Sequence, residues 1–268
     1  MCAFFHVSRS GYYDWCKRRD REDNSDIIMR DLIAECQRKN RQCYGYRRVV
    51  MWLRREYGIV ANHKSVLRIM NKYNMLAVVR RRRCYRRTLS GDLCHPNILK
   101  RNFKAERPNE KWATDITYIK TGEGVLFLSA IKDLYDNYII GYKTSKYQDF
   151  GLVARTINAA KRDTGDINGV IIHSDQGYQY TSFAYRSLTQ EYGMTISMSN
   201  PGNPLDNACA ENFFSILKTE CIYRETPNTL AEAEILVDEY IDYYNNERLQ
   251  VRTGMTPAEW RYLANYIA

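Results

Sequence analysis

Three carboxylates in unusual settings constrain this chain more than any other feature: Asp115, Asp175 and Glu211, which are 60 and then 36 positions apart. Asp115 interrupts an apolar and aromatic run that favours a β-strand, where Asp is depleted and costly to bury without a partner. Asp175 follows the apolar run 170–172, where open α/β sheets place their ligands. Glu211 opens a stretch with helical apolar spacing. A fold that gathers all three needs a cation to offset their repulsion.

Such a carboxylate cluster suits phosphoryl transfer. Hard oxygen ligands hold Mg²⁺ or Mn²⁺, and two ions about 3.5 to 4 Å apart stabilise the attacking and leaving oxygens of an in-line displacement. We therefore expect two Mg²⁺ (or Mn²⁺) ions, held by the three acids. The chain has 31 acidic residues, so the spacing alone is weak and the flanking residues decide.

The flanking motifs are WATDITY around Asp115, HSDQGYQYTS around Asp175 and DNACAENFFSILKTE around Glu211, with 35 residues between the second and third acids. YGYRRV at 44–49 lies upstream, and YNNER and TPAEW lie downstream. Together these motifs resemble the DDE transposases of the IS3 family, bacterial insertion-sequence enzymes related in fold to retroviral integrases. The resemblance covers nearly the whole chain.

The resemblance implies an α/β protein with a ribonuclease-H-like catalytic domain, in which helices flank a mixed five-stranded sheet, preceded by a small all-α helix-turn-helix-like domain. It implies that Asp115, Asp175 and Glu211 are both catalytic and metal-binding. The inferred reaction is metal-dependent DNA cleavage at insertion-sequence ends, which frees a 3′-hydroxyl, followed by strand transfer. Lys218 lies two helical turns after Glu211, and relatives carry a basic residue there, so we expect it to contact the terminal DNA.

The order of secondary-structure signals agrees with this fold. Strands are predicted at 111–120, 125–134, 138–145, 170–174 and 196–200, and helices at 150–162, 182–192 and from Glu211. In the ribonuclease-H-like fold the first and fourth strands are neighbours, so Asp115 and Asp175 are expected side by side. We divide the chain into a helix-turn-helix-like region (1–79), a basic linker (80–107) and a catalytic domain with C-terminal helices (108–268).

The N-terminal region contains a helical pattern at 26–36, a second helix through 47–57 ended by Gly58, and a third capped by Asn62. On the third helix Lys64, Arg68 and Lys72 share one face, which we interpret as a DNA-contacting face. A charged, solvated face is the alternative. The segment 7–19 is read either as part of another helix-turn-helix or as an ordinary surface helix.

The sequence RRRRCYRR follows at positions 80–87. Such a run of like charge cannot pack into a core, whereas arginine clusters bind phosphate. We interpret it as a DNA-binding arm that also serves as a linker; its arginines are Arg80, Arg81, Arg82, Arg83, Arg86 and Arg87.

The charge distribution agrees with a double-stranded DNA partner. Residues 1–110 contain 26 Lys and Arg against 11 Asp and Glu, whereas residues 111–268 contain 14 against 20. The first part is suited to lie on phosphates, and the second requires metal before it can approach them. The eight Cys and four His show no paired spacing, so we expect no zinc site.

No run of 18 apolar residues is present, and we expect a soluble, cytoplasmic, DNA-associated bacterial protein without a membrane partner. A homo-oligomer on DNA is expected, as is an upstream reading-frame product fused or bound at the N-terminus. Two other functions stay open: a nuclease that cuts without joining, and a non-catalytic DNA-binding repressor.

Several polar residues near the triad have weaker signals. His173 and Gln176 flank Asp175 and could position water or phosphate, although a histidine at a strand end is more often structural. Asp206 is expected to cap the Glu211 helix. The remaining acids lack a strand-end or motif setting and are left out of the site; these are Asp133, Asp136 and Glu220.

Overall fold

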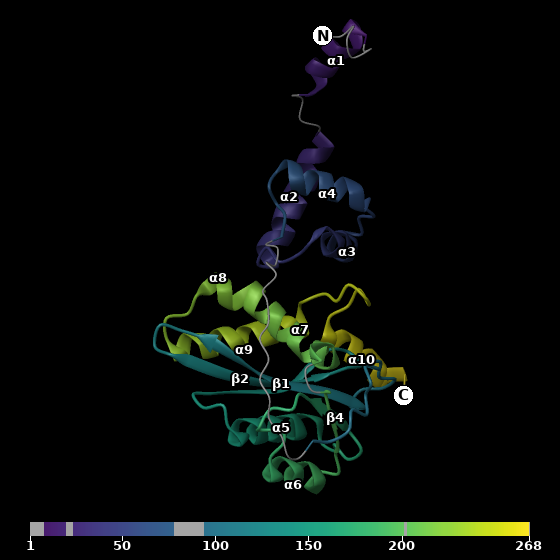
Figure 1. Cartoon of the computed structure of the whole chain (residues 1–268). Coiled ribbons are helices and arrows are strands. Elements are labelled where there is room, and N and C mark those ends of the chain that lie inside the picture. The colour runs from purple at the N-terminus through teal and green to yellow at the C-terminus, as the bar shows by residue number, and fades with distance from the viewer. Residues whose placement is uncertain (1–7, 20–23, 78–93, 201–202, 268) are drawn as a thin grey trace. The chain divides into compact units, whose positions relative to one another are not determined.

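A computed structural model describes residues 8–19, 24–77, 94–200 and 203–267 of the chain. The chain divides into two compact units, residues 1–79 and residues 80–268, which are described separately (Figure 1). The arginine cluster at 80–87 lies outside the described residues.

The first unit is helical. Its helices are α1 (Arg9–Arg19), α2 (Asn24–Lys39), α3 (Tyr46–Tyr57) and α4 (His63–Lys72). As predicted, the Asn62 side chain caps α4 by accepting a hydrogen bond from the backbone N–H of Lys64, at 2.9 Å, and Gly58 ends α3 in the left-handed conformation (φ 67°). The helices α2, α3 and α4 pack around buried apolar side chains that include Ile33, Leu53, Val66 and Met70.

The second unit is built on a five-stranded sheet of β1 (Lys111–Lys120), β2 (Val125–Asp133), β3 (Ile139–Ser145), β4 (Ile171–Ser174) and β5 (Thr195–Met198). The strand order is β3-β2-β1-β4-β5; β1 pairs antiparallel with β2 and parallel with β4. The expected mixed sheet is confirmed, as is the pairing of its first and fourth strands.

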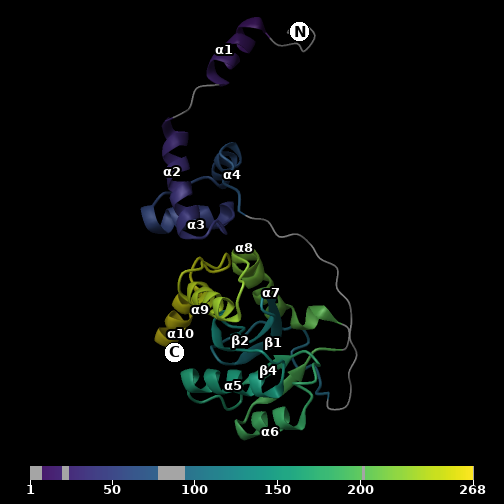
Figure 2. The same cartoon turned by 90° about the vertical axis from the view of Figure 1, so that its left-hand side faces the viewer.

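Helices cover both faces of the sheet (Figures 1 and 2). One face packs against α5 (Phe150–Thr164) and α6 (Phe183–Glu191), through a core that includes Trp112, Ile157 and Ile172. The other packs against α7 (Ala208–Leu217) and α9 (Leu230–Asn246), through Leu128, Phe213, Tyr240 and their neighbours. The short turns η1 (Pro204–Asn207), η2 (Lys218–Ile222) and α8 (Tyr223–Glu225) flank α7, and α10 (Pro257–Ile267) ends the described chain.

Within the described residues, no helix is long and apolar enough to cross a membrane.

Candidate active site

Asp115 and Asp175 lie on neighbouring strands of the sheet. Asp115 is in the middle of β1, and Asp175 directly follows β4. The parallel register pairs Ala113 with His173, so each aspartate lies two residues beyond a paired position and on the same face as that residue. Both side chains are half-buried. The pairing of β1 with β4 therefore brings Asp115 and the first residue after β4, Asp175, to the same face of the sheet.

Glu211 reaches the same region from the first turn of α7, which packs on β1. Burial raises the pKa of Asp115 well above its ordinary value, and the negative charges of Asp175 and Glu211 raise it further. Burial, and then repulsion by Asp175, also raises the pKa of Glu211. These interactions place the three carboxylates in one electrostatic cluster, drawn from two strands and one helix.

Local donors hold two of these carboxylates. Asp115 Oδ1 accepts a hydrogen bond from the backbone N–H of Ile116 at 2.8 Å, and Asp175 Oδ1 accepts one from that of Gly177 at 2.9 Å. Among the described residues, no three acidic, His or Cys side chains are arranged as a ready metal cluster. The hydrogen bonds from Ile116 and Gly177 favour the ionised forms and so lower the pKa values of Asp115 and Asp175, against the effect of burial. The donor set, three half-buried carboxylates with raised pKa values, still matches a hard divalent cation.

Lys218 adjoins the cluster at the end of α7. Its Nζ lies 4.5 Å from the centre of the Tyr118 ring, a cation–π contact with a side chain of β1. Burial lowers the pKa of Lys218, and the charge of Asp115 opposes that shift. Lys218 also begins a π-helical turn, a feature that the sequence pattern did not predict and that often occurs at functional sites.

Tyr180 is a further neighbour that sequence reasoning missed. Its side chain is buried, and its hydroxyl oxygen lies 3.5 Å from Thr114 Oγ1. Burial, followed by the charges of Asp115 and Asp175, raises the pKa of Tyr180 well above its ordinary value. The aromatic ring in the motif HSDQGYQYTS was the signal, but a buried tyrosine has the same pattern whether or not it approaches a site.

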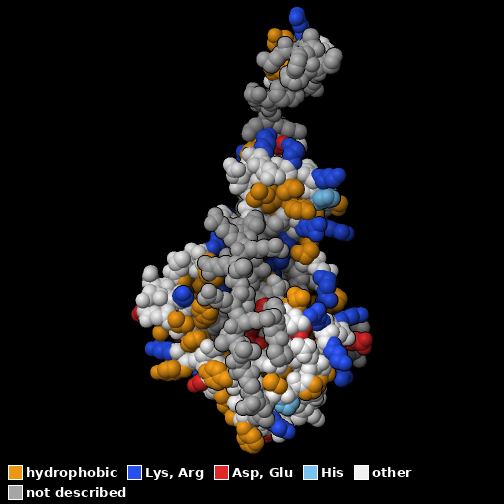
Figure 3. Space-filling model, in the orientation of Figure 1, with side chains coloured by type: hydrophobic (Ala, Val, Ile, Leu, Met, Phe, Trp, Pro, Cys, Tyr) orange, Lys and Arg blue, Asp and Glu red, His pale blue; other side chains and the backbone are white. Residues whose placement is uncertain are grey.

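The basic face expected on α4 is partly engaged within the first unit. Arg68 Nη1 donates to Asp26 Oδ2 at 2.8 Å, and Lys72 Nζ lies 3.5 Å from the same oxygen. The hydrogen bond from Arg68 contributes most to lowering the pKa of Asp26. The Lys64 side chain is exposed, and the Arg68 side chain keeps 57% of its surface exposed. Figure 3 shows Lys and Arg side chains gathered over the α3 and α4 region of this unit.

The expectation for Asp206 is wrong. No side chain caps the start of α7. Instead, Asp206 Oδ1 accepts from Arg101 Nε at 2.8 Å and Oδ2 accepts from Asn97 Nδ2 at 3.0 Å, so this buried carboxylate binds the segment that precedes β1. The carboxylate also accepts from the backbone N–H of Asn200 at 3.1 Å, so its oxygens are taken up by partners other than the start of α7.

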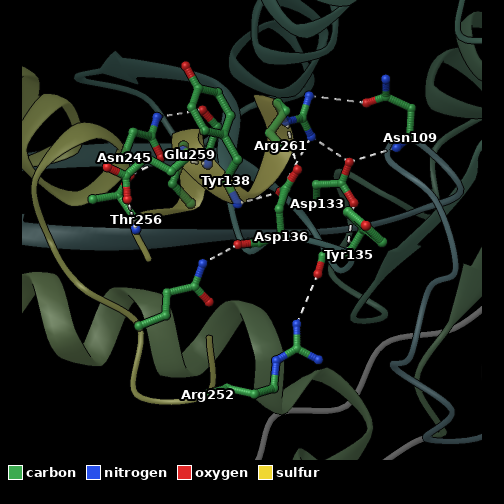
Figure 4. Close-up of polar contacts among 12 residues, drawn as sticks. Asn109, Asp133, Tyr135, Asp136, Tyr138, Asn245, Arg252, Thr256, Glu259 and Arg261 are labelled. Carbon is green, nitrogen blue, oxygen red and sulfur yellow. Dashed lines mark hydrogen bonds and ion pairs between the residues drawn. The ribbon is translucent and has the colours of Figure 1, made fainter. Parts of the chain in front are cut away.

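The acids left out of the site have arginine partners in the structure. Asp133 and Asp136 are fully buried and share Arg261 of α10 (Figure 4). Glu220 receives two hydrogen bonds from Arg248, each at 2.8 Å. These groups hold the C-terminal motifs against the β2–β3 turn and η2.

Family models match both units of the chain. An integrase core domain matches residues 105–204, a second integrase core model matches residues 211–263, and an HTH-like domain matches residues 23–83. The chain is 39% identical over 259 residues to a putative transposase InsK for insertion sequence element IS150 of Escherichia coli K12, covering 95% of this chain and 90% of that protein.

It is also 32% identical to the transposase InsF for insertion sequence IS3A of Escherichia coli K12, covering 97% of this chain and 92% of that protein. In fold it is similar to a chain of the simian T-cell lymphotropic virus intasome, with a TM-score of 0.54 at 17% identity, over 75% of this chain and 67% of the other. The ribonuclease-H-like fold is thereby confirmed. With an HTH-like domain, an integrase core and these relatives across nearly its whole length, the chain belongs to the IS3 family of insertion-sequence transposases.

Proposed function

We propose that Asp115, Asp175 and Glu211 are the residues with which this DNA transposase cleaves insertion-sequence ends and joins them to new DNA. The carrying observation is the electrostatic cluster: burial raises the pKa of all three half-buried carboxyls, and repulsion by neighbouring carboxylates raises the pKa values of Asp115 and Glu211 further. A cluster of this kind is costly in a protein without a function for it, because each ionised carboxylate destabilises the others.

The three carboxylates would hold Mg²⁺ or Mn²⁺, most simply as two ions. Bound there, the metal would supply activation of the attacking oxygen and neutralisation of charge on the leaving oxygen. The chain's own part is to hold the carboxylates on a rigid sheet and one helix. Lys218, fixed over Tyr118, provides a positive charge beside them for a phosphate of the terminal DNA.

The reaction has two displacements at phosphorus. In the first, water oxygen bonds to the phosphorus at the element end, the bond from phosphorus to the 3′-oxygen breaks, and that oxygen leaves as a 3′-hydroxyl. In the second, this hydroxyl bonds to another phosphorus and displaces its 3′-oxygen. No covalent bond to the protein forms, so a protein nucleophile is not required.

DNA binding is divided between the two units. In the first unit, Lys64, Arg68 and Lys72 of α4 would contact the duplex. In the basic linker that follows, six arginines would bind phosphates as an arm: Arg80, Arg81, Arg82, Arg83, Arg86 and Arg87. Because the two ends must be held together for joining, we infer a homo-oligomer on DNA. An upstream reading-frame product, fused or bound at the N-terminus, and action in the bacterial cytoplasm complete the proposal.

The test is a strand-joining assay on labelled DNA that carries the two ends of the element encoding the chain, with Mg²⁺ or Mn²⁺. Asp115→Asn, Asp175→Asn and Glu211→Gln are each expected to lower joining by at least about 100-fold. The control is Glu191→Gln, which removes an exposed acid of α6 and leaves joining unchanged.

The outcomes separate the candidate functions. Joining by any of the three carboxylate variants at the parent rate would overturn the assignment of that residue. Cutting without joining in the parent chain favours a nuclease, and binding without either favours a repressor.

A further inference from the structure

A row of four side chains crosses the sheet directly beside the carboxylates. The strand register places Lys132 of β2 opposite Ala113 of β1, Ala113 beside His173 of β4, and His173 beside Ser197 of β5. Paired residues point to the same face of a sheet, so the four lie in one line. Asp115 lies two residues beyond this row on the same face, so the row is the immediate support of the site.

His173 is the centre of a buried hydrogen-bond chain. Its side chain is fully buried, and Nε2 lies 2.8 Å from the backbone carbonyl oxygen of Asp206. A carbonyl can only accept, so Nε2 carries the proton. Nδ1 therefore accepts from the hydroxyl of Ser197 at 2.8 Å, and that hydroxyl oxygen accepts from the backbone N–H of Ile98 at 2.9 Å. These contacts fix both the tautomer and the plane of the ring.

Lys132 makes a corresponding contact from the other side of the row. Its Nζ lies 3.4 Å from the backbone carbonyl oxygen of Cys209, although only 5% of the residue is exposed. Burying an ammonium group is costly, and an apolar side chain would fill a sheet position at lower cost. Packing alone therefore does not explain the buried ammonium group of Lys132, whereas its contact with the Cys209 carbonyl oxygen gives it a role.

Both carbonyl oxygens belong to the chain segment that delivers Glu211. Asp206 and Cys209 precede Glu211 by five and two residues, in η1 and in the first turn of α7. Between the two contacts, Ala113 packs in the same apolar cluster as Ala210. The two small side chains, Ala113 and Ala210, let α7 approach β1 closely. The contacts to the carbonyl oxygens of Asp206 and Cys209 then fix the position of the start of α7 against the sheet.

We propose that His173 and Lys132 are positioning residues for strand joining: they hold the start of α7 so that Glu211 stands at a fixed place relative to Asp115 and Asp175. This inference rests on the proposed role of Glu211. Neither side chain is required to touch DNA. Each contacts a backbone carbonyl oxygen, of Asp206 or of Cys209. The position of the backbone at 206 and 209 therefore matters more to this role than the side chains there.

The experiment compares four variants of the full chain. Lys132→Met keeps the aliphatic stem and removes the ammonium group, and His173→Leu removes the ring contacts to Ser197, Ser199 and the Asp206 carbonyl. His173→Gln is the rescue variant, because its side-chain amide places an N–H donor near the former Nε2. Lys143→Met, which changes an exposed lysine on β3, is the matched control.

Two readouts are taken: single-turnover joining with saturating end DNA, and hydrogen exchange at the amides of 208–217 in the metal-free chain. We expect Lys132→Met and His173→Leu to lower the joining rate roughly 10- to 100-fold, as for a displacement of about 1 Å, with end binding unchanged. Exchange in α7 should accelerate in both. His173→Gln should recover most of the rate, and Lys143→Met should match the parent.

Glu211→Gln separates the two proposals. If Glu211→Gln joins DNA normally, the proposed function of Glu211 fails. If Glu211→Gln is inactive while Lys132→Met and His173→Leu show parent rates and parent exchange, the positioning role fails on its own. Should His173→Leu not fold, Lys132→Met decides the question: a parent rate, or a rate loss without faster exchange in α7, overturns the role.

Discussion

Arg261 is predicted to stabilise the second unit by several kcal/mol, because it is the shared partner of two buried carboxylates. Its Nη2 donates to Asp133 Oδ2 at 2.6 Å, and its Nε donates to Asp136 Oδ2 at 2.7 Å (Figure 4). The guanidinium also lies over the Tyr138 ring, 4.9 Å from its centre. Arg261→Met keeps the aliphatic packing and removes every one of these contacts.

The size of the loss follows from the two short bonds. Each charge-assisted hydrogen bond contributes ~1.5–3 kcal/mol, so two together contribute ~3–6 kcal/mol. Breaking a buried ion pair by removing one partner costs ~3–5 kcal/mol, which agrees. In a domain of this size each kcal/mol lowers the melting temperature by about 2–4 °C, so Arg261→Met should melt about 6–20 °C lower.

The loss should depend on pH. Burial, and then repulsion by Asp136, raises the pKa of Asp133 to about 6, against 3.8 for an ordinary Asp. A carboxyl with a raised folded-state pKa binds its proton more tightly when folded, so its destabilising effect grows as the pH rises through that pKa. Removal of Arg261 raises the pKa values of Asp133 and Asp136 further. The deficit of Arg261→Met should therefore be larger at pH 8 than at pH 5.

Scanning calorimetry at pH 5 and pH 8 measures both effects. The matched control is Arg162→Met, which breaks an ion pair with Asp163 whose arginine side chain is 72% exposed, and it should change the melting temperature by less than about 2 °C. Adding Asp133→Asn and Asp136→Asn to Arg261→Met should restore part of the loss at pH 8. A drop below about 3 °C, or an equal drop at both pH values, would refute the reasoning.

Three further predictions follow from single contacts. Asp26→Asn removes the carboxylate charge that Arg68 and Lys72 contact, so we expect tighter non-specific DNA binding with a steeper salt dependence, measured by fluorescence anisotropy across salt concentrations. Gly141→Ala should destabilise the second unit by about 1–3 kcal/mol in urea unfolding, because the added carbon would lie 2.8 Å from the backbone nitrogen of Ala160. Lys218→Gln should weaken binding of end DNA more than of unrelated DNA in a competition assay, and equal weakening would contradict a contact at the terminus.

The sequence predicted the sheet well because its strands have strong apolar patterns. The predicted strand 111–120 matches β1, and the other four strands lie within two residues of the predicted bounds. The side-by-side placement of Asp115 and Asp175 followed from the fold that the motifs implied, and the β1–β4 pairing agrees. Local apolar patterns were enough to predict features that depend on a single strand or helix.

Long-range polar pairing was harder to predict. Asp206 has the sequence position of a helix cap but forms an ion pair with Arg101. On α4, Arg68 and Lys72 form ion pairs with Asp26. The π-helical turn at Lys218 also lacked a signal, since its apolar spacing resembles that of an α-helix. The two ion-pair arrangements depend on residues distant in sequence, and sequence periodicity does not show which of several partners a charged side chain contacts.

Two pairs of acids, Asp133 with Asp136 and Asp115 with Asp175, show how a structural ion-pair site differs from a candidate reactive site. Asp133 and Asp136 resemble Asp115 and Asp175 in that all four lie within or just after a strand of the same sheet, and burial raises the pKa of each. The two pairs differ in the cation that neutralises them. Arg261 meets Asp133 and Asp136 directly and completes their charge balance within the chain. Among the described residues, Lys218 is the cation that acts on Asp115. The three carboxylates therefore keep a net negative charge that a divalent ion would balance, and this imbalance supports the proposal that they are the reactive set.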